Sequence, residues 1–212
     1  MPSASRLPLF DLPPDAQSAW LAARLARPAP HSAIGLSDGF RLPGRDGAAI
    51  PAAVLVPLVN RPHGLQLLLT QRSETLPDHP GQICFPGGRL EPADVDHAAA
   101  ALRETHEEIG LAQNRVRVLG ELSTYQTVSG YEVRPIVGWV EPPFELAPDP
   151  IEVADVFEVP LEFILDPANH RRNHRMIGDQ RRDYWAIPWT TRYIWGATAA
   201  MLLILHRTLH DE

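Results

Sequence analysis

A pair of glycines followed by a short acidic helix constrains this chain more than any other part of its sequence. Gly87 and Gly88 break the backbone, and residues 98–109 then predict a helix. Asp96 or Asp94 can cap its start, and Gly110 stands where a helix commonly ends. The face that can pack on a sheet consists of Ala98, Leu102, Thr105 and Ile109. The opposite face is left free for chemistry.

That opposite face carries three glutamates, Glu104, Glu107 and Glu108, at spacings of three and four residues. Like charges at this spacing destabilise a helix by roughly 0.2–0.5 kcal/mol per pair, so something should compensate. Hard divalent cations such as Mg²⁺ favour clustered carboxylate oxygens and share phosphate oxygens of a substrate. We interpret the glutamates as candidate metal ligands, with a solvated helix face as the alternative. Ala100 and Ala101 are small enough to leave room for a bulky anion beside them.

Composition excludes several classes of protein. The 212 residues are 44% hydrophobic, enough for one domain with a core. All 19 basic residues are Arg, which excludes a Lys nucleophile and a P-loop lysine. A net charge of -7 argues against long nucleic acid as a partner. The single cysteine, Cys84, excludes an internal disulfide and is expected to be buried and inert.

Nothing in the sequence indicates secretion or a membrane span. Residues 1–15 contain no long apolar segment of the kind found in signal peptides. The most apolar stretch, residues 197–205, is much shorter than the ~20 residues that cross a bilayer. We therefore expect a cytoplasmic protein without a membrane partner. A homodimer is compatible with the sequence.

The remaining chain predicts a mixture of strands and helices without strict alternation, which favours an α+β fold. Residues 1–47 are expected to form an N-terminal arm with a short helix at 15–25, ended by Pro28 and Pro30, and residues 48–212 one domain. Strands are predicted at 50–59, 65–71, 116–122, 131–140 and 151–159. After a helical turn at 161–165 we expect a hairpin of residues 174–177 and 184–187, and a helix at 191–210.

The segment from Gly87 to Leu111 resembles the Nudix box, whose pattern is G-x5-E-x7-R-E-U-x-E-E-x-G-U, with U a bulky aliphatic residue. The direct matches are Arg103, Glu104, Glu107, Glu108, Gly110 and Leu111. Thr105 stands where the pattern has an aliphatic residue. Asp94 occupies the first acidic position, and eight residues rather than seven separate it from Arg103.

This resemblance implies a Nudix-type α/β/α sandwich with a mixed sheet and a loop–helix–loop catalytic motif. It also implies a diphosphate hydrolase that uses Mg²⁺ or Mn²⁺ and acts on a small nucleotide derivative. By position, Glu104 and Glu108 resemble the principal metal ligands, and Glu107 a further one. The carbonyl of Gly87 would supply another oxygen, and Arg103 would orient the glutamates.

Two further sets of residues are implied at this site. Glu152, before a predicted strand, is a candidate general base, with a surface charge as the alternative. The candidates for substrate binding are Arg72, Gly87, Gly88 and Arg89.

The flanks of the box are similar to Nudix enzymes that hydrolyse coenzyme A. Their signature is L-L-T-x-R-S/A-x3-R-x3-G-x3-F-P-G-G, and residues 68–73 and 79–88 fit it, with Pro77 in place of the second Arg. Residues 129–139, 156–161 and 192–202 also resemble bacterial members of that subfamily. The implied substrate is coenzyme A or acyl-CoA, cleaved to 3′,5′-ADP and a 4′-phosphopantetheine fragment. The alternatives are another nucleoside diphosphate derivative, such as ADP-ribose, and a non-catalytic nucleotide-binding sensor.

Two groups of side chains near the C-terminus can each be interpreted in two ways, as part of a binding site or as part of the fold. The first could hold a terminal phosphate or be a solvated hairpin, and consists of Arg171, Arg172, Arg175, Arg181 and Arg182. The second is expected to pack in the core, with stacking on adenine as the alternative, and consists of Tyr184, Trp185, Trp189 and Trp195.

Overall fold

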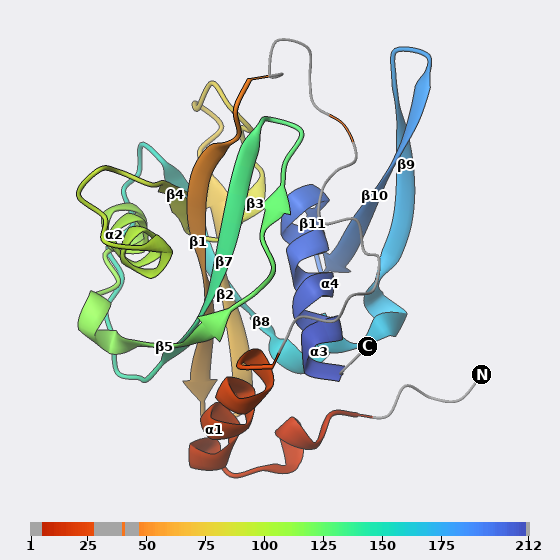
Figure 1. Cartoon of the computed structure of the whole chain (residues 1–212). Helices are drawn as coiled ribbons and strands as arrows, with labels where there is room; N and C mark the ends of the chain where they lie inside the picture. The colour runs from red at the N-terminus through yellow and green to blue at the C-terminus, as the bar shows by residue number, and fades with distance from the viewer. Residues whose placement is uncertain (1–5, 28–39, 41–46, 211–212) are drawn as a thin grey trace.

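The structure is a computed structural model and describes residues 6–27, 40 and 47–210. A central mixed sheet lies between helix α2 (His97–Ile109) on one face and a second layer on the other (Figure 1). That second layer contains helices α1 (Pro14–Leu25), α3 (Leu161–Leu165) and α4 (Gly196–His210), with a small three-stranded sheet. No helix among the described residues is long and apolar enough to span a bilayer.

The central sheet has eight strands and is built around β1 (Ile50–Arg61). Its path runs β3-β2-β1-β7-β5, with β4 paired to β1, β6 to β7 and β8 to β2. β1 and β7 run parallel over ten residue pairs, and the other pairs are antiparallel. The other strands are β2 (Gly64–Arg72), β3 (Ile83–Cys84), β4 (Gly87–Arg89), β5 (Val116–Glu121), β6 (Tyr125–Gln126), β7 (Tyr131–Val140) and β8 (Val153–Pro160).

Alternation along the strands divides the core in two. Side chains of a strand point to opposite faces in turn, so a strand with both faces covered is apolar throughout. Leu55 and Leu68 pack beneath α2, while Val56, Leu58 and Leu67 pack toward α4. This arrangement explains why the apolar strands predicted at 50–59 and 65–71 are found as β1 and β2, with Pro62 and His63 in the turn between them.

The ends of α2 are set by its sequence. The Asp96 side chain accepts a hydrogen bond from the Ala99 N–H at 2.7 Å and caps the helix, so Asp96 rather than Asp94 fills this role. Gly110 ends it in the left-handed conformation, with φ of 71°. A Cβ at this position would lie 2.8 Å from the backbone nitrogen of Ala147, so glycine is required on two grounds.

The prediction that Ala100 and Ala101 leave room beside the acidic face is wrong. Both alanines are fully buried between α2 and the sheet, where their small side chains let the helix lie close to the strands. Ala98 and Leu102 are only partly buried at the edge of this contact.

The N-terminal segment packs into the main core. Four leucines of this segment belong to the same buried cluster as the sheet, namely Leu7, Leu9, Leu21 and Leu25. The helix predicted at 15–25 is found as α1, and Pro28 and Pro30 lie outside the described residues. Three short 3-10 helices occur at Pro8–Asp11, Gln113–Arg115 and Pro167–Asn169.

The C-terminal region differs most from expectation. A helix was predicted from residue 191, but Arg192–Trp195 is a strand, β11, and α4 begins at Gly196 with φ of 64°. β11 pairs with β10 (Gln180–Trp189), which pairs with β9 (Arg171–Ile177), so the predicted hairpin is the larger part of a second sheet. Aromatic and β-branched residues favour strands, and the pairing of Ile194 with Ile187 fixes the conformation.

Candidate active site

Two glycines allow the acidic face of α2 to approach the sheet. Gly87 and Gly88 of β4 pair with Val54 and Ala53 of β1. A Cβ on Gly87, whose φ is 148°, would lie 2.4 Å from the carbonyl oxygen of Ala53. A Cβ on Gly88 would lie 2.5 Å from the carboxyl carbon of Glu104. Any side chain at either position would therefore displace β4 or Glu104.

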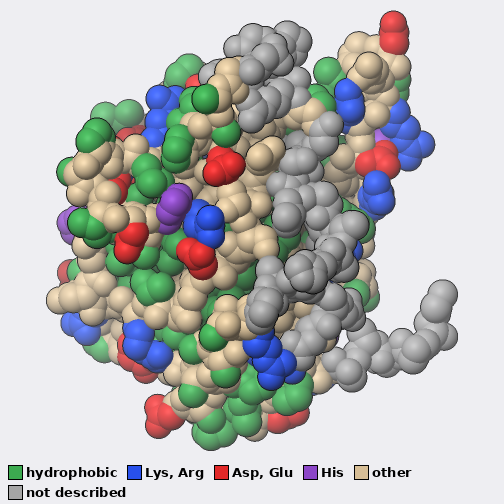
Figure 2. All heavy atoms as spheres, viewed as in Figure 1, with side chains coloured by type: hydrophobic (Ala, Val, Ile, Leu, Met, Phe, Trp, Pro, Cys, Tyr) green, Lys and Arg blue, Asp and Glu red, His purple; other side chains and the backbone are tan. Residues whose placement is uncertain are grey.

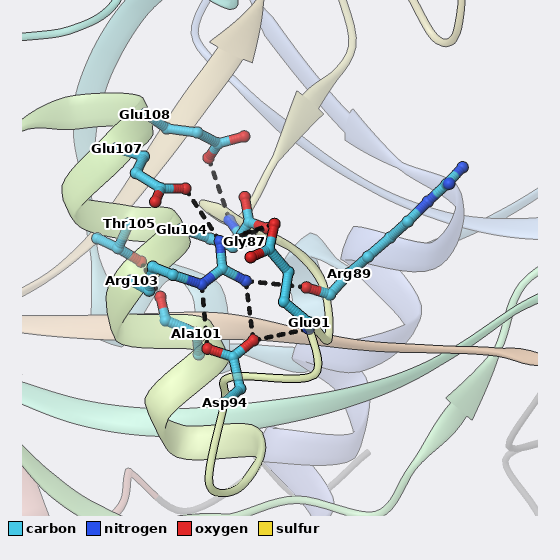
Figure 3. Close-up of polar contacts among 10 residues, drawn as sticks. All are labelled: Gly87, Arg89, Glu91, Asp94, Ala101, Arg103, Glu104, Thr105, Glu107 and Glu108. Carbon is cyan, nitrogen blue, oxygen red and sulfur yellow. Dashed lines mark hydrogen bonds and ion pairs between the residues drawn. The ribbon is translucent and has the colours of Figure 1, made fainter.

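Arg103 is the centre of a network of charged hydrogen bonds (Figure 3). Its Nη1 donates to Glu104 Oε1 and to Glu107 Oε2, both at 3.0 Å. Nε and Nη2 donate to the two carboxylate oxygens of Asp94, and Nη2 also to the carbonyl oxygen of Arg89 at 3.1 Å. The hydrogen bonds to Asp94 contribute most to raising the pKa of Arg103 and also lower the pKa of Asp94. One guanidinium thus fixes two of the glutamates on the helix and the loop before it.

Glu108 is held separately from that network. Its side chain is buried, at 6% exposure, and its Oε2 accepts a hydrogen bond from the Gly87 N–H at 3.1 Å. Burial raises the pKa of Glu108 to about 7, and the negative charges of Glu152 and Glu104 add to the rise. The Gly87 hydrogen bond and the cation of Arg72 act in the opposite direction. Burial also raises the pKa of Glu104.

The carboxylate oxygens on α2 suit a hard divalent cation. Among the residues that the structure describes, no three His, Cys, Asp or Glu side chains form a ready-made metal cluster. Arg103 contacts Glu104 and Glu107, and a backbone N–H holds Glu108. The raised pKa values of Glu104 and Glu108 show that their ionised forms are disfavoured where they lie. A cation would relieve that penalty, so the donor set fits Mg²⁺ or Mn²⁺.

Glu152 and Arg72 lie beside these carboxylates. Glu152 is exposed in the turn before β8, and its backbone carbonyl accepts a hydrogen bond from the Ser73 N–H at 2.8 Å. Its negative charge acts on both Glu104 and Glu108, so it lies within electrostatic reach of the cluster. Arg72, at the end of β2, acts on Glu108 with the opposite sign. One negative and one positive side chain from outside the helix, Glu152 and Arg72, therefore act on the carboxylates of α2.

Arg89 is placed differently from the other predicted residues. Its backbone carbonyl belongs to the Arg103 network, but its side chain points away from the carboxylates (Figure 3). The guanidinium donates to the hydroxyl of Tyr131 through Nε at 3.0 Å and Nη2 at 2.6 Å. Tyr131 was not singled out from the sequence, because the contact joins residues 42 apart in the chain.

Asp94 is a residue of the network whose contacts the sequence left undefined. Besides its two bonds to Arg103, it accepts a hydrogen bond from the Glu91 N–H at 2.8 Å, which closes the loop before α2. The only indication of these contacts in the sequence was that Asp94 occupies the first acidic position of the box motif. Thr105, the other departure from the motif, is buried and donates to the Ala101 carbonyl oxygen at 2.6 Å. Its hydroxyl is therefore satisfied within the helix, so a polar residue can stand there.

Cys84 does not provide a nucleophile. The residue is partly exposed rather than fully buried as expected, and its Sγ lies 3.3 Å from Thr70 Oγ1. Burial of the thiol raises its pKa to about 11, so the thiolate is scarce at neutral pH. The expectation of an inert thiol agrees with this chemistry.

Comparison with known proteins agrees with this geometry. The family model described as "NUDIX domain" matches residues 49–178. A protein of Photorhabdus laumondii named "Uncharacterized Nudix hydrolase NudL" is 42% identical over 153 residues, covering 71% of this chain and 80% of that protein. One of the same name from Escherichia coli K12 is 40% identical over 152 residues, covering 71% and 78%. The chain belongs to the Nudix family of hydrolases, and the predicted α+β Nudix sandwich is confirmed.

Solved structures with a similar arrangement are more distant. A MutT protein from Methanosarcina mazei is 18% identical, with a TM-score of 0.49, and covers 78% of this chain and 96% of that chain. The Ap4A hydrolase of C. elegans in a binary complex is 23% identical, with a TM-score of 0.46, and covers 52% and 80%. Neither likeness bears on the substrate of this chain.

Proposed function

We propose that this chain hydrolyses the diphosphate linkage of a nucleotide derivative, with Mg²⁺ or Mn²⁺ held by Glu104, Glu107 and Glu108. The observation that carries the proposal is the state of Glu108. A buried carboxylate whose pKa is raised to about 7, next to a second carboxylate with a raised pKa, favours a cation as its partner. When bound, the cation would neutralise the negative charge of the diphosphate and lower the pKa of the attacking water.

The residues around the glutamates position these ligands. Arg103 holds both Glu104 and Glu107 through Nη1, with both hydrogen bonds at 3.0 Å. The Gly87 N–H holds Glu108 toward β4, and we propose the Gly87 carbonyl as a further oxygen ligand. These contacts are made before substrate arrives, which reduces the reorganisation needed during the reaction.

We assign the general base to Glu152. It is exposed, so water can reach it, and its charge acts on Glu104 and Glu108. In this role its carboxylate takes a proton from the water that attacks phosphorus. Glu152 belongs to the loop before β8, outside the helix, so it can move a proton without giving up a ligand position.

Positive groups near the glutamates are proposed to bind the substrate phosphates. Arg72 is close enough to Glu108 to lower its pKa and can bind a phosphate oxygen at the same time. Gly88 leaves the backbone of β4 open to a close approach, since no side chain covers Glu104 there. Arg89 is proposed to bind a more distant part of the substrate, because its side chain points away from the carboxylates (Figure 3).

Coenzyme A or acyl-CoA is the substrate that we propose. The support is the signature in residues 68–73 and 79–88, which here form the end of β2, the loop after it and the strands β3 and β4. Arg72 and Gly87 both belong to these segments, and Gly87 donates to Glu108, which supports the proposal. We further propose that residues 48–212 are one Nudix domain, since α4 and β10 share a buried cluster with the central sheet.

A panel of diphosphates tests this function. The purified chain is incubated with coenzyme A, acetyl-CoA and ADP-ribose, each with Mg²⁺, Mn²⁺ or a chelator, and the products are separated by chromatography. We expect 3′,5′-ADP from coenzyme A with either metal and no product with the chelator. Preferred cleavage of ADP-ribose would replace the proposed substrate, and an absence of cleavage in the whole panel would overturn the function.

A further inference from the structure

The three-stranded sheet β11-β10-β9 has one face that packs on the core and an opposite face on which only Ala186 is fully buried and Arg182 lies 4.3 Å from the Phe40 ring centroid. Residue pairing places alternate side chains on opposite faces. On one face Ile187 and Ile194 are fully buried, and Trp185 and Trp189 pack against the core. The other face, named here the aromatic–arginine face, contains Arg171, Arg175, Arg182, Tyr184, Tyr193 and Trp195.

Aromatic rings on this face are held in place by contacts with one another. Tyr184 meets Trp195 edge-on, with ring centroids 5.4 Å apart, and the guanidinium of Arg175 lies 5.4 Å from the centroid of Trp195. The Tyr193 hydroxyl accepts a hydrogen bond from Asn173 Nδ2 at 2.7 Å and lies 3.4 Å from that of Tyr184. Tyr193 is nevertheless 42% exposed. The face therefore offers ordered rings to a ligand.

The arginines of the two faces differ in whether they form ion pairs. On the core-facing side, Arg172 and Arg181 both pair with Asp183, at 3.3 and 3.0 Å. On the aromatic–arginine face, Arg171 and Arg175 form no ion pair with any residue that the structure describes. β9 and β10 project from the body of the fold at the upper right (Figure 1), where basic side chains lie next to acidic ones and the basic ones predominate (Figure 2). This is a local excess of positive charge in a chain of net charge -7.

We propose that the aromatic–arginine face is a second binding site, which takes a mononucleotide. A base stacks on the exposed ring of Tyr193, and phosphate oxygens accept hydrogen bonds from Arg175 and Arg171. A guanidinium stacked on an indole keeps its N–H edge free for such an anion. The net charge of the whole chain disfavours a long polynucleotide, which would meet repulsion beyond the hairpin. The site does not depend on catalysis by the carboxylates of α2.

Calorimetric titration of the full chain with ADP tests the site. The buffer contains a chelator, so that the acidic cluster on α2 has no cation with which to attract phosphate. We expect ADP to bind, and adenosine and pyrophosphate each to bind at least ~10-fold more weakly than ADP. Arg175→Gln should weaken ADP binding at least ~10-fold, about the effect of one charged hydrogen bond.

Arg172→Gln is the matched control, because Arg172 lies on the same strand but on the opposite face. It should change ADP affinity less than ~2-fold, and Arg72→Gln, at the proposed active site, should leave it unchanged. The proposal is overturned if wild-type chain does not bind ADP, or if Arg172→Gln weakens binding as much as Arg175→Gln. Loss of binding in Arg72→Gln would place ADP at the active site instead, because without a cation the carboxylates of α2 repel phosphate and Arg72 is the charge beside them that could hold it. Tighter binding of an unphosphorylated decanucleotide than of ADP would also contradict the mononucleotide assignment.

Discussion

Arg103 donates to both carboxylate oxygens of Asp94, through Nε at 3.0 Å and Nη2 at 2.9 Å. The Asp94 side chain is only 5% exposed, so this pair is largely shielded from water. It ties the loop after β4 to the middle of α2, and the same guanidinium holds Glu104 and Glu107. The extra residue between Asp94 and Arg103 is therefore accommodated without loss of the ion pair.

Asp94→Asn should lower both stability and turnover. The variant removes the charge that accepts two of the Arg103 hydrogen bonds, which we expect to lower the free energy of unfolding and to lower kcat at least ~10-fold. Denaturant unfolding and steady-state kinetics measure the two effects. Glu91→Gln is the control, since Glu91 is 60% exposed and 4.0 Å from Arg103, and it should change neither value appreciably. Equal effects of the two substitutions would show that the Asp94–Arg103 pair contributes no more than the distant contact of Glu91.

Glu108→Gln should stabilise the metal-free chain above neutral pH. The folded-state pKa of Glu108 is raised to about 7 from an ordinary 4.5, so the folded state disfavours the ionised form. The resulting penalty is absent below pH 4.5, grows as pH rises toward 7, and is complete above it. We expect a gain on the order of 2 kcal/mol at pH 8 and a much smaller one at pH 5.

Chemical denaturation in the presence of a chelator measures this difference at the two pH values. The Gln side chain can still accept the Gly87 hydrogen bond, so the substitution changes the charge and keeps the contact. A variant that is less stable than wild type at pH 8 would show that Glu108 is favourably ionised in the fold.

Glu152→Gln tests whether Glu152 acts as the general base rather than as a metal ligand. If Glu152 takes the proton from water, kcat should fall by roughly 10²-fold, a typical value for loss of a general base. The affinity for Mn²⁺, measured by calorimetry, should stay within about 2-fold because the ligands on α2 are intact. Unchanged turnover would return Glu152 to the role of a surface charge.

Pro77 should reduce discrimination between coenzyme A and its 3′-dephospho form. Proline has neither a charge nor an N–H donor, and Pro77 is exposed in the loop between β2 and β3. We expect a ratio of kcat/KM values below ~10 for the wild-type chain, and a higher ratio for Pro77→Arg, since a charged hydrogen bond contributes about 1.5–3 kcal/mol. A wild-type preference above ~100-fold would mean that another residue recognises the 3′-phosphate.

Local signals predicted the part of the fold that carries the site. The spacing of apolar residues and the residues Asp96 and Gly110 place α2 within one residue of its observed start and at its observed end. β11 was missed because the strand preference of Tyr193, Ile194 and Trp195 covers too few residues to outweigh the helical pattern that follows it. Its strand conformation depends on pairing with β10, which the sequence pattern does not show.

The site was predicted to the level of residue type, but not of side-chain direction. The motif identified Glu104, Glu107 and Glu108, which the structure places around Arg103 and Gly87. It could not show that the Arg89 side chain leaves this group for Tyr131, since that contact depends on where β4 and β7 lie relative to each other.

Binding of Mn²⁺ to the full chain, followed by electron paramagnetic resonance, tests most directly whether the carboxylates of α2 hold the metal. We expect wild-type chain to bind Mn²⁺ and both Glu104→Gln and Glu108→Gln to weaken that binding at least ~10-fold. Glu145→Gln, a change at an exposed glutamate in the loop before β8, should leave the affinity unchanged. Wild-type affinity in Glu108→Gln and Glu104→Gln would contradict the account.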